Sequence, residues 1–137
     1  METVKKFSRR WGPAVVMMTA IYLASDTPGP SLPHFNQWDL LVKKGGHALG
    51  YALLGMAYAW GLAGRRPTGR ALIQAGLLAA AYAVTDELHQ TQTPGRSPSP
   101  VDVGLDTAGA AAGVAVWGWA RRRAAAADPG RPGNKVP

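Results

Sequence analysis

Four long apolar stretches, separated by short polar segments, set the pattern of the chain. They cover about residues 11–27, 44–63, 70–90 and 101–120. An α-helix needs roughly 20 residues to cross the hydrocarbon core of a bilayer, and the last three stretches have that length. The first has a shorter apolar centre and reaches the length with its flanking residues. The pattern therefore predicts four helices long enough to span a membrane.

These stretches lack the polar outer face that a helix of a soluble protein needs. Residues 53–64 read LLGMAYAWGLAG, so apolar side chains surround the whole helix. A helix on the surface of a soluble domain instead has one apolar and one polar face, repeating with a period near 3.6 residues. We therefore favour a membrane-embedded bundle over the alternative of a compact soluble all-α domain.

The first stretch has a second interpretation. Its basic start, its apolar run and the Ala24-Ser25 pair resemble a cleavable secretory signal peptide, and Ser8-Arg9-Arg10 resembles part of a twin-arginine signal. Cleavage would leave three spans and would place the two termini on opposite sides of the membrane. We favour a retained first helix, because four spans sort the charges of the chain more completely.

With four spans, both termini and the segment near residues 64–70 share one side of the membrane. That side holds 12 of the 15 Lys and Arg residues and only two of the eight Asp and Glu residues. Basic residues near membrane helices favour the cytoplasmic side. The sequence therefore predicts an all-α membrane protein, a four-transmembrane-helix bundle with both termini cytoplasmic.

Composition and charge limit the possible functions and divide the chain into a domain and a tail. The net charge of +7 does not indicate a nucleic-acid partner, because the basic residues flank apolar stretches and no nucleic-acid-binding motif is present. The chain has no cysteine, which excludes disulfides and thiolate chemistry. We expect one domain over residues 1–123. Residues 124–137 are rich in Pro and Gly and are predicted to form a disordered cytoplasmic tail.

Polar side chains gather at the other end of the predicted bundle, in the second, third and fourth helices and in the loop before the fourth. Residues three or four apart share a helix face, so each helix presents its polar groups together. All lie at a similar depth and can converge on one site. The candidate site residues are His47, Tyr51, Asp86, Glu87, Gln90, Arg96, Asp102 and Asp106.

A glycine stripe indicates which way two of the acids point. Asp102, Asp106, Gly109 and Gly113 lie on one helix face, and a Gly-x-x-x-Gly pair lets a partner helix approach closely. We therefore expect this face, with its carboxylates, to point into the bundle. A charge at the bilayer centre costs about 2.5–3.5 kcal/mol and less near the interface, so a counter-ion is expected. Arg96 is the predicted partner, because its guanidinium matches a carboxylate with two hydrogen bonds.

Several uses of such a cluster are possible. We favour an outward-facing pocket that binds a ligand. The alternative is a set of ion pairs whose only role is to hold three helices together. A metal site of His47 with Asp86, Glu87 or Asp102 is a looser alternative, because the chain lacks an H-E-x-x-H motif; we expect no metal and no cofactor. An intramembrane hydrolase or transferase, with Glu87 as general base and His47 as acid, lacks a clear nucleophile.

The same residues follow the order and spacing of a known family. The matching segments are Lys44-x-x-His47-x-x-x-Tyr51-x-x-Leu54-Gly55, Asp86-Glu87-x-x-Gln90, Pro94-Gly95-Arg96-Ser97 and Asp102-x-x-x-Asp106-x-x-Gly109-x-x-x-Gly113. In these segments, over about residues 15–120, the chain resembles the VanZ-like family of small bacterial membrane proteins. The family usually carries Asn at the position of Asp106, so this chain has an additional acid in the site.

The resemblance implies a multi-pass protein of the bacterial cytoplasmic (inner) membrane with a role in the cell envelope. The founding member of the family is linked to low-level resistance to the glycopeptide teicoplanin. The implied partners are membrane lipids and a lipid-linked cell-wall intermediate or lipoglycopeptide. The family supplies no established catalytic residues, so the resemblance leaves open whether the protein is an enzyme. It carries over, as candidate ligand-binding residues, His47, Tyr51, Glu87, Gln90, Arg96 and Asp102.

Overall fold

The computed structural model describes residues 1–64 and 67–127. Its helices are α1 (Glu2–Asp26), α2 (Asp39–Ala63), α3 (Gly69–Gln90) and α4 (Pro100–Ala126). Two short 3-10 turns, η1 (Gly29–Ser31) and η2 (Asn36–Trp38), lie between α1 and α2. The described residues hold four α-helices and no strand, which confirms the predicted all-α class. Of the predicted tail, α4 includes the first residues, and residues 128–137 lie outside the described part.

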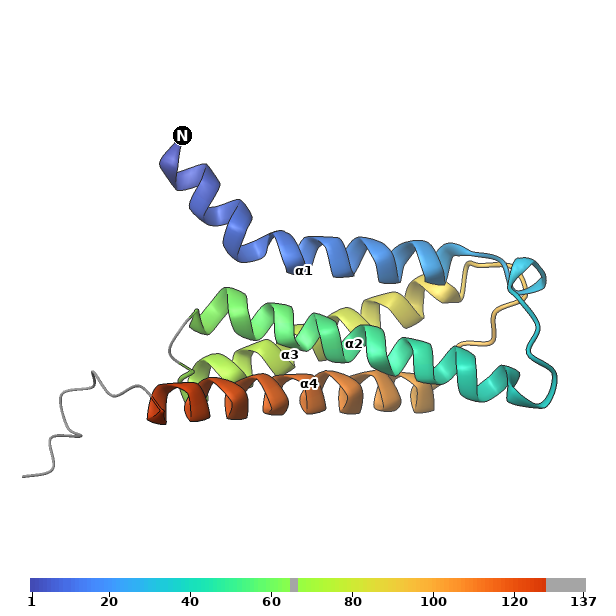
Figure 1. The fold of residues 1–137 in the computed structure, drawn as a ribbon. Coiled ribbons are helices and arrows are strands. Elements are labelled where there is room, and N and C mark those ends of the chain that lie inside the picture. Colours follow the sequence, from blue (N-terminus) through green and yellow to red (C-terminus); the bar gives the residue numbers. More distant parts are fainter. Residues whose placement is uncertain (65–66, 128–137) are drawn as a thin grey trace, which may run out of the picture.

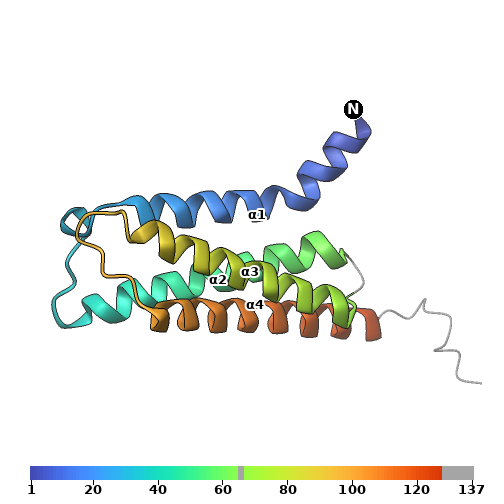
Figure 2. The ribbon, with the colours of Figure 1, turned by 180° about the vertical axis from the view of Figure 1, so that it is seen from behind.

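The helices run alternately up and down the bundle (Figures 1 and 2). The N-terminus of α1 and the C-terminal end of α4 therefore lie at one end, and the loops after α1 and α3 lie at the other. The first turns of α1 bend away from the bundle (Figure 1), and Pro13 lies inside this helix. Proline lacks a backbone N–H and clashes with the preceding turn, so it is the physical cause of such a bend.

Glycines bring α2 and α4 into backbone contact. A Cβ atom at Gly109 would collide with the carbonyl oxygen of Ala48, and one at Gly113 would collide with that of Ala52. In the opposite direction, a Cβ atom at Gly55 of α2 would lie 2.5 Å from the carbonyl oxygen of Ala110. The prediction that the glycine stripe of α4 points into the bundle is confirmed. The stripe also determines how α4 is rotated, and therefore where its acids lie.

Small residues fill the interior, and large aliphatic residues lie outside. The buried core consists mainly of alanines with a few larger residues, and Ala59, Ala75, Ala79 and Tyr51 have no exposed surface. Large side chains that face outward occur on every helix and include Val16, Leu49, Leu53, Ile73, Leu77, Leu88 and Val101. Soluble monomers rarely expose apolar surface of this extent, whereas membrane helices pack through small residues. Among the described helices, α3 alone meets the length and hydropathy expected of a membrane span.

The two loops at the end opposite the termini contact each other. The backbone N–H of Gly29 donates to the carbonyl oxygen of Pro94 at 3.0 Å. Gly95 adopts a positive φ of 72°, a conformation that favours glycine, and a Cβ atom there would lie 2.7 Å from Cδ of Pro30. The loop after α1 is thereby tied to the loop before α4 at the end of the bundle that holds the polar side chains.

Candidate functional site

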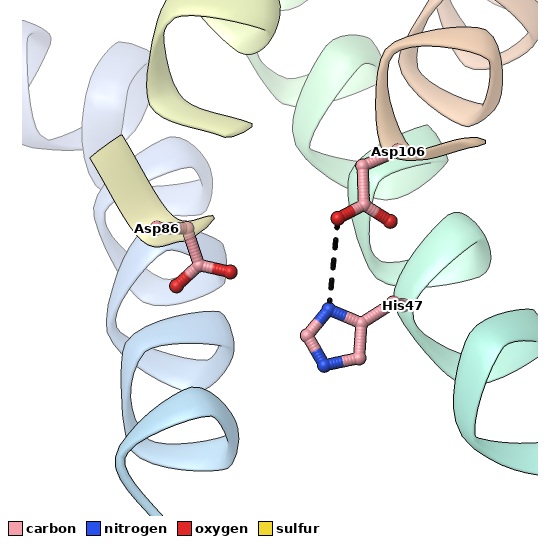
Figure 3. A group of neighbouring side chains, drawn as sticks. All are labelled: His47, Asp86 and Asp106. Atoms are coloured by element: carbon pink, nitrogen blue, oxygen red, sulfur yellow. Dashed lines mark ion pairs between the residues drawn. The ribbon is translucent and has the colours of Figure 1, made fainter. Parts of the chain in front are cut away.

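The polar end of the bundle brings together residues from three helices. His47 of α2 lies 3.7 Å from Asp106 of α4, measured from Nδ1 to Oδ2 (Figure 3). Asp86 of α3 approaches from the other side and points toward the same space (Figure 3). Asp86 and Asp106 are 4% and 3% exposed, so both carboxylates are nearly withdrawn from solvent. Buried carboxylates need partners, because an uncompensated buried charge is costly.

Asp86 receives its hydrogen bonds from α1 and from its own helix. Ser25 Oγ donates to Asp86 Oδ2 at 2.9 Å, and Gln90 Nε2 reaches the same oxygen at 3.3 Å. Gln90 Nε2 also donates to Ser25 Oγ at 3.2 Å, which closes a buried triangle. Sequence reasoning missed Ser25 as a member of the site. The only signal was a serine at the same depth as the other polar groups, next to the end of an apolar stretch.

Tyr51 lies one helical turn after His47 and is fully buried. Its ring packs near that of Tyr82, with 6.2 Å between the centroids. Its hydroxyl makes no hydrogen bond of acceptable geometry to the described residues. The hydroxyl nevertheless lies close enough to Asp86 and Asp106 to interact electrostatically with both carboxylates. A buried polar group left in this way is uncommon in folded proteins and calls for an explanation.

Glu87 holds the beginning of α4. Its Oε1 accepts the backbone N–H of Ser99, which is the N-cap residue of α4. The Ser99 side chain in turn accepts the backbone N–H of Val101. A carboxylate near a helix N-terminus is favoured by the free N–H groups there and by the helix dipole. Glu87 therefore positions the helix that carries the other acids, in addition to facing the site.

The structure corrects the predicted partner of the carboxylates. Arg96 donates from Nε to the carbonyl oxygen of Thr27 at 3.2 Å and from Nη2 to that of Ala24, and so satisfies free carbonyls at the end of α1. It makes no ion pair with a carboxylate among the described residues. The ammonium of Lys44 pairs with Asp102 instead. Sequence reasoning did not place Lys44 in the site, although it precedes His47 by one helical turn.

A cavity of about 630 Å³ opens at this end of the bundle. Six of the eight predicted site residues line it, whereas Tyr51 and Asp86 do not. Lys43, Lys44 and His34 add basic groups to its lining, and Leu32 and Leu105 add apolar ones. The predicted residues in the lining are His47, Glu87, Gln90, Arg96, Asp102 and Asp106.

An apolar groove of about 370 Å³ adjoins this cavity between α1 and α2. Its lining includes Met17, Ile21, Val42 and Gly46. It shares several lining residues with the polar cavity, so the two spaces lie side by side. The shared residues are Leu32, Lys43, His47 and Arg96.

The basic side chains at the mouth of the cavity are held by short-range ion pairs. Lys43 Nζ donates to Asp39 Oδ2 at 2.7 Å, one turn earlier on α2. This hydrogen bond is the main cause that lowers the pKa of Asp39, and the backbone N–H of Phe35 adds to it. Both Lys43 and Asp39 remain partly exposed, so the pair orients Lys43 and contributes little to stability.

The fold and site define a class of protein: an antiparallel four-helix bundle with an apolar exterior and a polar cavity at the end opposite its termini. A sequence model of the VanZ/LLP1 family matches residues 3–121. The chain belongs to this family, as the spacing of its polar residues predicted. No curated protein and no solved structure matches the chain.

Proposed function

We propose that this protein is a multi-pass protein of the bacterial inner membrane, spanning it four times with both termini in the cytoplasm. The large aliphatic side chains on the outside of all four helices support the proposal, because they would face lipid. The distribution of charge supports the orientation. Most Lys and Arg residues lie at the end that holds both termini, which the positive-inside rule assigns to the cytoplasm.

The absence of cysteine makes this topology directly testable. Single cysteines are introduced as Ser31→Cys, in the loop that contacts Gly95, and as Ser8→Cys, near the N-terminus; both serines are exposed. A membrane-impermeant maleimide applied to intact spheroplasts is expected to label Ser31→Cys. It should label Ser8→Cys only after the membrane is opened. Labelling of Ser8→Cys in intact spheroplasts would reverse or abolish the proposed orientation.

The proposed function is the binding of an amphiphilic envelope molecule, such as a lipid-linked cell-wall intermediate or a lipoglycopeptide. The observation that carries this proposal is the apolar groove beside the polar cavity, with Leu32, Lys43, His47 and Arg96 lining both. A headgroup would occupy the cavity, and an acyl or prenyl chain would occupy the groove between α1 and α2. A molecule with one polar and one apolar part fits both spaces at once.

The cavity offers groups for both charges of a headgroup. Arg96 uses Nε and Nη2 for carbonyls of α1, which leaves the two N–H groups of Nη1 for a phosphate or carboxylate. Lys43 supplies a second cation at the rim. Glu87 and Gln90 can accept hydrogen bonds from sugar hydroxyl or amine groups. Through such binding the protein would modulate susceptibility to teicoplanin, the role that the family resemblance suggests.

The experiment fills the groove without touching the polar cluster. Gly46 lines the groove, and a Cβ atom there would meet no atom within 4 Å, so Gly46→Leu fits the fold and occupies the groove. Native mass spectrometry of the protein released from detergent is expected to show a co-purifying amphiphile on the unsubstituted chain. We expect its occupancy to fall at least tenfold in Gly46→Leu.

The neighbouring glycine provides the matched control. Gly45 is exposed, also has open space around it, and lines neither the cavity nor the groove. Gly45→Leu should retain the amphiphile and, expressed in a susceptible bacterium, any protection against teicoplanin; Gly46→Leu should lose both. Equal occupancy in the two variants would contradict binding in the groove. Retained amphiphile without any change in teicoplanin susceptibility would leave binding intact and contradict the antibiotic role.

A further inference from the structure

A metal-ligating set of side chains lies beneath the polar cavity. One ligand atom from each of His47, Asp86 and Asp106 lies within 4.8 Å of the other two. The three residues come from α2, α3 and α4 and converge on one space (Figure 3). The sequence alone led us to expect no metal, because it pointed to no definite set of three ligands. The structure selects Asp106, which no sequence-based metal set included.

The donor types and their separations suit a divalent transition-metal ion. Imidazole nitrogen and carboxylate oxygen both bind Zn²⁺, at about 2.0–2.2 Å, so donors in a tetrahedral site lie about 3.3–3.6 Å apart. His47 Nδ1 and Asp106 Oδ2 are separated by 3.7 Å, close to this distance. All three ligand atoms lie within 4.8 Å of one another, so a bound ion would draw them closer together. Two buried carboxylates also carry the charge that a dication neutralises.

The surroundings of Asp86 resemble the outer shell of a metal site. Ser25 and Gln90 both donate to Oδ2 and so fix the carboxylate, while Oδ1 receives no hydrogen bond from these donors. Ligands of metal ions are commonly oriented by such hydrogen bonds to their second oxygen or nitrogen. The carboxylate is thus held with one oxygen available to a ligand.

A second, independent observation points to a missing ligand. The Tyr51 hydroxyl is fully buried, lacks an adequate hydrogen bond to the described residues, and is acted on by the charges of Asp86 and Asp106. Buried hydroxyls are nearly always satisfied in folded proteins. A water molecule or anion bound to a metal at this point would give the hydroxyl its partner.

We propose that His47, Asp86 and Asp106 bind one divalent transition-metal ion of the zinc class at the base of the cavity. His47 and Asp106 also line the cavity, so the remaining coordination of the ion faces a bound molecule. A phosphate or carboxylate oxygen is the ligand such a position accepts. The proposal rests on the cluster alone and does not depend on which molecule occupies the cavity.

The test is a titration of the full chain with Zn²⁺. The protein is purified in detergent with an affinity tag that contains no histidine, stripped with a chelator and titrated calorimetrically; elemental analysis gives the stoichiometry. We expect about one Zn²⁺ per chain. We expect at least tenfold weaker binding in His47→Ala and in Asp106→Asn, because each loses one ligand. Binding should weaken as the pH falls, because protons compete for the histidine.

A second histidine supplies the matched control. His89 on α3 lies 3.1 Å from Asp26, so it is also a histidine paired with an aspartate, but it lies outside the cluster. His89→Ala should bind Zn²⁺ as the unsubstituted chain does. Circular dichroism and elution volume verify that each variant is folded. Failure of the unsubstituted chain to bind Zn²⁺ would overturn the proposal even if a variant does not fold. Unchanged binding in both His47→Ala and Asp106→Asn would overturn it as well.

Discussion

Gly113→Leu is expected to destabilise the folded bundle strongly. Even a Cβ atom at this position would overlap the carbonyl oxygen of Ala52, and that oxygen belongs to the backbone of α2 and cannot rotate away. Overpacking a core usually costs about 1–3 kcal/mol, and a clash with backbone lies at or above the upper limit. We expect a loss of about 3 kcal/mol or more, equivalent to a decrease in Tm of about 10 °C, with much of the protein aggregating.

The measurement is thermal unfolding in detergent, followed by circular dichroism and by elution volume. Gly104→Leu is the matched control, because Gly104 lies on the same helix and a Cβ atom there would meet nothing within 4 Å. This control should unfold within about 2 °C of the unsubstituted chain. A Gly113→Leu protein as stable as the Gly104→Leu protein would show that α2 and α4 do not contact through this glycine.

Ser25→Ala is expected to loosen α1 from the rest of the bundle. The serine is completely buried and links α1 to the buried Asp86: its hydroxyl donates to the carboxylate and accepts from Gln90. Its removal leaves both partners without one hydrogen bond in a buried site. An unsatisfied buried group costs about 1–3 kcal/mol. Because Gln90 still donates to Asp86, neither partner is left without any hydrogen bond, and we expect a total loss of about 2 kcal/mol.

Amide hydrogen exchange distinguishes this local effect from general damage. In Ser25→Ala we expect faster exchange in the second half of α1 and little change in α2 and α4. Thr19→Ala is the control, since Thr19 lies on the same helix, is exposed, and donates only to the carbonyl oxygen of Val15 in its own helix. Equal exchange of α1 in the two variants would mean that the Ser25 hydrogen bonds do not hold this helix.

The sequence predicted Arg96 as the partner of the acids, whereas in the structure Lys44 pairs with Asp102. Arg96 lies six residues before Asp102, and proximity in sequence favoured their pairing. In the structure the loop turns toward α1, where free carbonyls at a helix end bind the guanidinium. Lys44 is 58 residues from Asp102 in sequence, yet the contact of α2 with α4 brings the two together.

The sequence by itself determined the four helices, the inward-facing glycine stripe of α4 and the gathering of polar groups at one end, because these follow from length, hydropathy and helical period, which are local. The family followed from the spacing of the same residues. Only the tertiary structure decided that Ser25 reaches Asp86 and that His47, Asp86 and Asp106 share one space. Those contacts depend on how helices that are distant in sequence are positioned along their axes and rotated about them. A shift of one residue turns a side chain by about 100° around its helix.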